Sequence, residues 1–149
     1  MTRRELPSVI RSRGGFTLIE IIVVVTVIAI IAALVGPSVF RQLGRAKDAA
    51  ARSQMEMLGA ALDAYRLDNG RYPTTAQGLA ALNTEPTIEP QPRNWQGPYL
   101  RRDVPLDPWG YPYDYTCPAV ESTGGYDLMT HGADGEPGGE GEDADITAW

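Results

Sequence analysis

The sequence predicts an α+β fold in which one long N-terminal helix packs on a small antiparallel β-sheet. Three observations support this prediction. An apolar run extends from Phe16 to Val35, helical periodicity continues as far as Asn69, and the later segments alternate apolar and polar residues between Pro and Gly. We expect the first half of the helix to span a membrane and the second half to pack on the sheet.

The first 15 residues, MTRRELPSVIRSRGG, form a basic leader with a net charge of +3. The apolar run that follows, residues 16–35, would extend about 30 Å as a helix, which matches the hydrocarbon core of a bilayer. Positive charge precedes this span and none directly follows it, so we expect the leader in the cytoplasm and the rest outside. The small residues Gly14 and Gly15 precede the apolar run, which argues against an ordinary signal-peptidase site.

Glu20 is an ionisable residue inside the apolar run. A carboxylate in lipid is costly unless it finds a partner. Glu20 could lie near the cytoplasmic end and reach the interface, or it could pair with a cation in an assembly. Cleavage after Gly15 would create such a cation, the α-amino group of Phe16. Along one helix this amine lies too close in sequence to reach its own Glu20 well. The amine of a neighbouring subunit could reach Glu20 better.

Residues 36–69 continue the helix as an amphipathic segment. The dipeptide Gly36-Pro37 predicts an interruption directly after the span. Beyond it, four apolar residues fall at spacings of three and four and predict one buried face: Met55, Leu58, Leu62 and Tyr65. Gly70 supplies the expected C-terminal cap. Residues 16–69 would therefore form a helix of roughly 80 Å, too long for one small domain to bury.

Residues 70–149 are expected to form a small α+β domain. A short helix at residues 73–82, capped by Thr74 or Thr75, is followed by a proline-rich loop at residues 86–98. Alternating aromatic residues then predict a strand, and Gly124-Gly125 predicts a hairpin turn. The three expected strands are residues 111–117, residues 126–130 and a short last segment at residues 146–149.

The charge of the chain is unevenly distributed. Residues 103–149 hold 11 acidic residues and no Lys or Arg, which argues against nucleic-acid binding by this part because it has no cation for phosphates. A single Cys, Cys117, excludes an intrachain disulfide, and a single His, His131, excludes a multi-histidine metal centre. A nucleophile–base pair of these two residues is less favoured than a packed or free thiol. We therefore expect no enzyme activity.

The segment DGEPGGEGEDAD, residues 134–145, suits Ca²⁺ because it combines carboxylate oxygens with a flexible glycine-rich backbone. An EF-hand is rejected because Pro137 and Gly138 occupy the fourth and fifth positions of its template. A disordered acidic tail explains the composition about equally well.

The junction Gly15-Phe16-Thr17-Leu18-Ile19-Glu20 resembles the class III leader junction of type IV pilins and type II secretion pseudopilins. The resemblance implies that an inner-membrane prepilin peptidase cuts between Gly15 and Phe16. It also implies N-methylation of Phe16 and neutralisation of the Phe16 amine by Glu20 of an adjacent subunit during assembly.

Three later segments resemble the G-type major pseudopilins of type II secretion. They are YRLDNGRYPTT followed by QGL (65–79), DPWGYPY (107–113), and GADG (132–135) closing on Asp145-Ile146. The resemblance implies a pilin-like fold and a homopolymeric periplasmic pseudopilus that drives export of folded proteins across the outer membrane. It also implies a Gram-negative inner-membrane location with one membrane pass, contact with lipid before assembly, and minor pseudopilins and an inner-membrane assembly platform as partners.

This resemblance also implies a calcium loop whose side-chain ligands are Asp134 and Asp145. Further candidate ligands are the backbone carbonyls of His131 and Glu136, together with Asp143 and Glu142. Two alternatives remain open. One is a type IV pilin subunit, although these usually close their C-terminal region with a disulfide; the other is a signal-anchored, calcium-dependent periplasmic binding protein.

Overall fold

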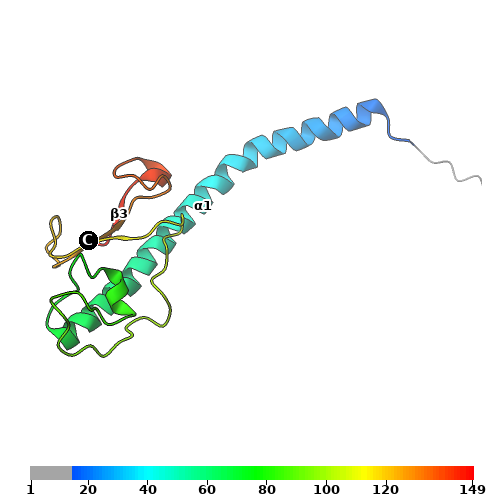
Figure 1. Cartoon of the computed structure of the whole chain (residues 1–149). Coiled ribbons are helices and arrows are strands. Elements are labelled where there is room, and N and C mark those ends of the chain that lie inside the picture. The colour runs from blue at the N-terminus through cyan, green and yellow to red at the C-terminus, as the bar shows by residue number, and fades with distance from the viewer. Residues whose placement is uncertain (1–14) are drawn as a thin grey trace, which may run out of the picture. The chain divides into compact units, whose positions relative to one another are not determined.

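The computed structural model describes residues 15–149, so the predicted leader lies outside the described residues except for Gly15. The chain divides into two compact units, Met1–Phe40 and Arg41–Trp149. One helix, α1, belongs to both (Figure 1). The elements in chain order are α1 (Leu18–Asn69), η1 (Leu79–Leu82), β1 (Asp114–Thr116), β2 (Asp127–Thr130), η2 (Gly141–Asp143) and β3 (Ile146–Thr147).

The first half of α1 is an uncovered apolar helix. It begins after Thr17, whose hydroxyl accepts a hydrogen bond from the Glu20 N–H at 3.3 Å. The large apolar side chains from Leu18 to Val35 are about half or more exposed, and α1 is long and apolar enough to cross a membrane. The helix continues through Gly36 and Pro37, as the predicted continuation over residues 36–69 requires, so the dipeptide does not end it. Proline removes only one N–H donor, and the Ser38 hydroxyl adds a bond to the Val35 carbonyl at 2.8 Å.

The second half of α1 supplies one wall of the core, as the periodicity predicts. Met55, Leu58, Leu62 and Tyr65 are all at most 2% exposed. Burial of such side chains contributes about 1.5–3 kcal/mol each relative to exposure. Gly70 ends the helix with φ of 74°, and its N–H bonds to the Arg66 carbonyl at 2.7 Å.

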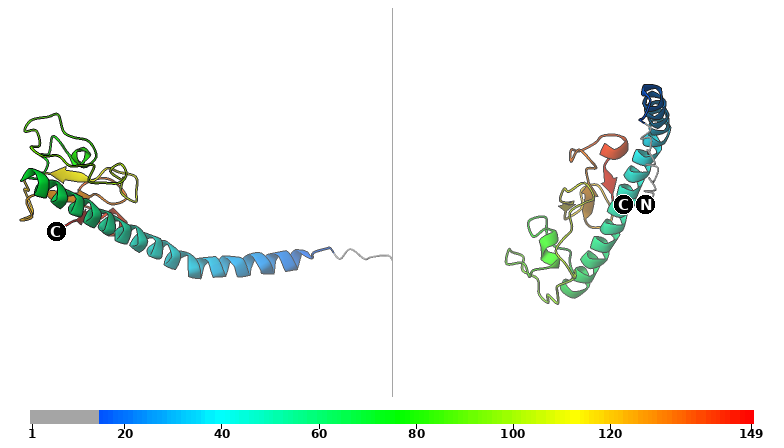
Figure 2. Two further views of the ribbon diagram at one scale, coloured as in Figure 1. Left: turned by 90° about the horizontal axis from the view of Figure 1, so that it is seen from below. Right: turned by 90° about the vertical axis from the view of Figure 1, so that its right-hand side faces the viewer.

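The sheet is antiparallel in the order β1-β2-β3, as expected for two hairpin-linked strands and a last short strand. Tyr115 pairs with Leu128 and Thr130 pairs with Ile146. Figure 2 shows the strands and loops gathered along the C-terminal half of α1. The first strand is shorter than predicted and begins at Asp114. Tyr111 belongs instead to the preceding turn and is 41% exposed.

The predicted helix at residues 73–82 is only partly formed. Thr74 and Gln77 form a reciprocal pair: the Gln77 N–H bonds to the Thr74 hydroxyl at 3.3 Å, and the Thr74 N–H bonds to the Gln77 side-chain oxygen at 3.0 Å. This is the geometry of a capping box. The segment it begins is a turn followed by the 3₁₀ helix η1, since Gly78 has φ of 60° and breaks the α-helical path. The proline-rich stretch at residues 86–98 contains no helix or strand, as predicted.

Two buried carboxylates fix the loops around the sheet. Asp107 accepts hydrogen bonds from the N–H groups of Trp109, Gly110 and Tyr111 and from the Thr130 hydroxyl, and these bonds hold a tight turn that precedes β1. Asp127 binds the loop before β2 through three backbone N–H groups, those of Val120, Glu121 and Ser122.

The ionisation of Asp127 follows from these contacts. Desolvation opposes the charged form, but the hydrogen bonds from Glu121, Val120 and Ser122 outweigh it and lower the pKa of Asp127 from 3.8 to about 2. The stabilisation from this carboxylate is therefore present above about pH 4. It is lost as the pH falls towards 2.

Tyr65 and Tyr115 are both buried in the core, but only the Tyr115 hydroxyl has a hydrogen-bond partner in residues 15–149, so comparing their Phe variants tests the packing. The Tyr115 hydroxyl donates to the Pro73 carbonyl at 2.7 Å, whereas the Tyr65 hydroxyl, fully buried, has no partner among the described residues. We predict that Tyr115→Phe lowers the free energy of unfolding by about 1 kcal/mol, and that Tyr65→Phe leaves it unchanged or raises it. Chemical denaturation of the two variants measures both effects. A larger loss for Tyr65→Phe than for Tyr115→Phe would contradict this packing.

Candidate functional site

The first candidate site is the N-terminal junction. Gly15 and Phe16 precede α1, and Phe16 is 78% exposed. Glu20 lies in the first turn of α1 and is exposed. The negative charge of Glu20 is favourable there because the N-terminal end of a helix carries partial positive charge. Thr17 and Glu20 also have the spacing of a capping box, a local role that our sequence analysis did not consider.

The second candidate site is the C-terminal acidic loop, defined as residues 134–143. The ends of this loop are held together, because the Ala133 N–H bonds to the Glu142 carbonyl at 2.9 Å. Five glycines in or beside the loop have positive φ: Gly132, Gly135, Gly138, Gly139 and Gly141. An ordered, closed loop with these turns differs from the disordered tail that composition alone allows.

Asp145 is the best-connected carboxylate beside the loop. One of its oxygens lies 3.1 Å from Nδ1 of His131, and the other accepts a hydrogen bond from the Gly138 N–H at 3.0 Å. The Nε2 atom of the same imidazole lies 3.7 Å from Asp114 on β1. Asp145 therefore connects the acidic loop to the sheet, and Asp114 is a participant that the sequence analysis missed because it is distant in sequence.

The other predicted ligands are placed differently. Asp134 accepts a hydrogen bond from the Glu136 N–H at 3.0 Å, which forms a local turn. The Glu142 side chain covers Gly44 on α1, and a methyl group at Gly44 would lie only 2.6 Å from its Oε1 atom. Asp143 lies in η2, where its N–H bonds to the Glu140 carbonyl at 3.3 Å. Within residues 15–149, no three His, Cys, Asp or Glu side chains are grouped so as to hold a metal ion.

The Cys117 thiol and the His131 imidazole do not form a catalytic pair, because they contact different partners. The Cys117 thiol donates to the Gly125 carbonyl at 3.5 Å, whereas His131 contacts Asp145 and Asp114. Tyr113 and Tyr115 are buried, and burial raises the pKa of both hydroxyls. Burial, and secondarily the charge of Asp107, raises the pKa of Tyr113 to about 12. The Tyr113 hydroxyl donates to Gln54 on α1, which ties the sheet region to the helix.

Two family models match the chain. Residues 38–149 match the model for the type II secretion system (T2SS), protein G, and residues 10–36 match the prokaryotic N-terminal methylation motif. The "Type II secretion system core protein G" of Pseudomonas aeruginosa is 48% identical over 139 residues, covering 93% of this chain and 96% of that protein. The protein of the same description from Vibrio cholerae is 46% identical over 140 residues, covering 93% of each chain.

A solved structure is also similar. The crystal structure of the major pseudopilin from the type 2 secretion system of enterohaemorrhagic Escherichia coli matches with a TM-score of 0.61 and 43% sequence identity. The match covers 70% of this chain and 88% of that one. The long helix packed on a small sheet is therefore an arrangement that this chain shares with an experimentally determined pseudopilin.

The geometry of the acidic loop predicts different effects for two of its glycines. A methyl group at Gly132 would meet the Glu142 carbonyl oxygen at 2.7 Å and two further backbone atoms within 3.0 Å, whereas one at Gly138 would meet nothing within 4 Å. Both residues have positive φ, so either alanine substitution costs about 1–3 kcal/mol in strain. We predict a clearly lower melting temperature for Gly132→Ala than for Gly138→Ala. Equal melting temperatures would show that the loop does not close as described.

Proposed function

Because the chain belongs to the type II secretion system protein G family and is a major pseudopilus subunit, we propose that it polymerises through its apolar span. The observation that supports this mechanism is the contrast between the two units. The large apolar side chains from Leu18 to Val35 lack cover, whereas unit Arg41–Trp149 contains its own hydrophobic core. Growth of the resulting periplasmic fibre would push folded proteins across the outer membrane. The role is structural, with no catalytic step.

We further propose a life cycle in two environments. The precursor is inserted as a single-pass protein of the Gram-negative inner membrane, and lipid covers residues 16–35 until assembly. Prepilin peptidase cuts between Gly15 and Phe16, and Phe16 is N-methylated. The inner-membrane assembly platform and the minor pseudopilins then receive the mature subunit, and other copies replace lipid around the span.

In this proposal Glu20 directs docking by pairing with the Phe16 amine of an adjacent copy. A carboxylate and an ammonium group in an apolar surrounding attract strongly, and each would be costly there alone. The local alternative is that Glu20 only stabilises the start of α1. The two roles can be separated because Gln can take the Glu position of a capping box but cannot neutralise an amine.

We predict that Glu20→Gln reduces fibre yield at least tenfold and leaves membrane insertion unchanged. Fibres sheared from cells and the monomer in the membrane fraction are quantified by immunoblotting, and helix content is compared by circular dichroism. Intact mass spectrometry of both proteins must show a start at Phe16, so that a processing defect is not mistaken for a docking defect. Wild-type fibre yield from Glu20→Gln would refute the docking role.

We also propose that the acidic loop binds Ca²⁺ through the carboxylates of Asp134 and Asp145 and the carbonyls of His131 and Glu136. The donor set fits this ion, since it consists of hard oxygens on a backbone that glycines allow to turn. Asp143 and Glu142 are secondary candidates, and Glu142 would have to leave Gly44 to take part. A bound cation supplies positive charge among crowded carboxylates. Asp145 would then hold the loop to the sheet through the cation as well as through His131.

We predict that calcium raises the melting temperature of a fragment of residues 38–149. With free calcium at about 100 times Kd the stabilisation is about 3 kcal/mol, or roughly 10 °C for a domain of this size. Asp134→Asn should remove the increase, and Asp103→Asn, an exposed carboxylate outside the loop, is the control with the same change in charge. Identical melting curves for the wild-type fragment in calcium and in EGTA would reject the site.

A further inference from the structure

Arg41 and Arg45 form an exposed pair of positive charges on adjacent turns of α1. Like charges four residues apart on a helix repel each other. Asp48 is the one acidic residue three or four positions from either of them. In residues 15–149, no Lys or Arg side chain lies within 4 Å of a carboxylate, and the only contacts of that kind are those of the His131 imidazole. The arginine pair therefore has no anionic partner in the part of the chain that the structure describes.

The acidic loop has the complementary property. It carries five carboxylates and no Lys or Arg within residues 134–143: Asp134, Glu136, Glu140, Glu142 and Asp143. Glu136 and Glu140 are exposed. The hydrogen bonds found for these two residues use only their backbone atoms. Their side-chain charges are therefore available to an external cation.

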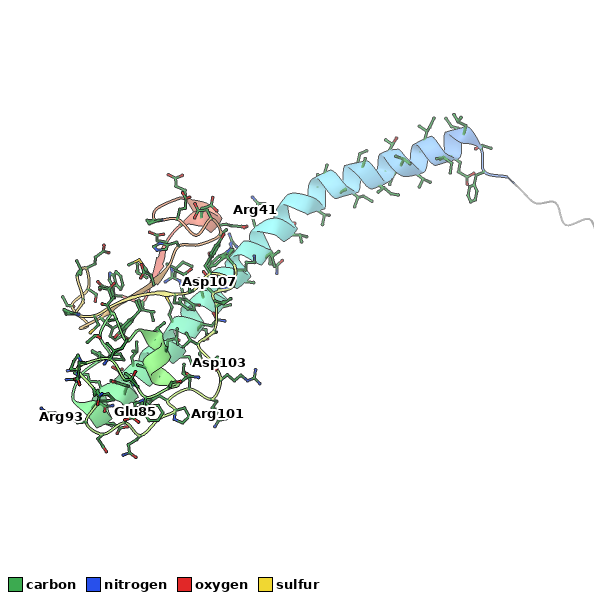
Figure 3. The ribbon with its side chains drawn as sticks, in the orientation of Figure 1. Arg41, Glu85, Arg93, Arg101, Asp103 and Asp107 are labelled. Atoms are coloured by element: carbon green, nitrogen blue, oxygen red, sulfur yellow. The ribbon has the colours of Figure 1, made fainter. Side chains whose placement is uncertain are left out.

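The acidic loop contacts α1 beside the arginine pair, but no carboxylate of the loop lies within 4 Å of either guanidinium group. Its Glu142 side chain covers Gly44, and Figure 3 shows Arg41 on α1 near this loop. Gly44 is buried on the face of α1 that contacts the domain, whereas Arg41 and Arg45 are exposed. Because successive residues of an α-helix are about 100° apart, Arg41 lies about 60° and Arg45 about 100° from Gly44, both on the same side of it. Among the described residues neither arginine lies within 4 Å of a carboxylate, so each copy carries a basic and an acidic surface that are not paired with each other.

We propose that the arginine pair of one copy binds the acidic loop of a second copy in the fibre. The inference rests on the proposed polymerisation, because a homopolymer supplies a second copy with the complementary charge. Two different surfaces of one chain that bind each other make a heterologous contact, which repeats in an open filament. The contact would also place the excess negative charge of the C-terminal region next to the cations of a neighbour.

The charges can be exchanged to test this pairing. Arg41→Glu with Arg45→Glu makes the pair acidic, and Glu136→Lys with Glu140→Lys makes the loop basic. Because the Glu136 carbonyl is a proposed calcium ligand, the melting temperature of the second variant is compared in calcium and in EGTA before its fibres are counted. Each double variant should lose at least tenfold in fibre yield when expressed alone. Expressed together they should recover fibres that contain both, because the acidic pair of one now fits the basic loop of the other. Arg93→Glu, which changes an exposed arginine elsewhere, is the control and should assemble normally.

Each result bears on the inference. Wild-type yields from either double variant alone would overturn the pairing while leaving the pseudopilus function intact. Continued failure on co-expression, with both variants inserted in the membrane and folded, would also overturn it and would indicate another partner for the arginines, such as lipid phosphate. Failure of the wild-type protein itself to form fibres would refute the proposed polymerisation, and this inference with it.

Discussion

The constraint on which the rest of this molecule depends is the uncovered apolar run at the start of α1. Residues 16–35 contain too little polar surface to remain in water, and among the described residues nothing covers them. Apolar surface of this extent must be removed from water by lipid or by other proteins. In the proposed life cycle the subunit passes from lipid to other copies, so one segment would serve both membrane anchoring and polymerisation.

The unit Arg41–Trp149 achieves stability by other means. Its sheet has short strands, and much of its chain is loop, so backbone N–H groups need side-chain acceptors. Asp107 and Asp127 supply them for two loops, and tyrosine hydroxyls connect the sheet to α1 and to Pro73. The acidic loop contacts α1 through Glu142 at Gly44.

Sequence patterns predicted the features that follow from periodicity and from turn chemistry. The buried face of α1, its end at Gly70 and the antiparallel hairpin were correct, because spacing and glycine conformations are local properties. The shortness of β1 was not predicted, since it depends on the competing turn at Asp107. The contacts of Asp145 with His131 and of Glu142 with Gly44 join distant segments. No local pattern specifies such pairs.

The most direct test of this account is to determine what covers the span in each state. A photo-crosslinking amino acid in place of Val27, which is 48% exposed, reports the immediate neighbours of the apolar run. Irradiation should give lipid adducts in the membrane-bound monomer and covalent dimers of the chain in isolated fibres. Lipid adducts without dimers in the fibres would show that other copies do not replace lipid around the span, and would contradict the central claim.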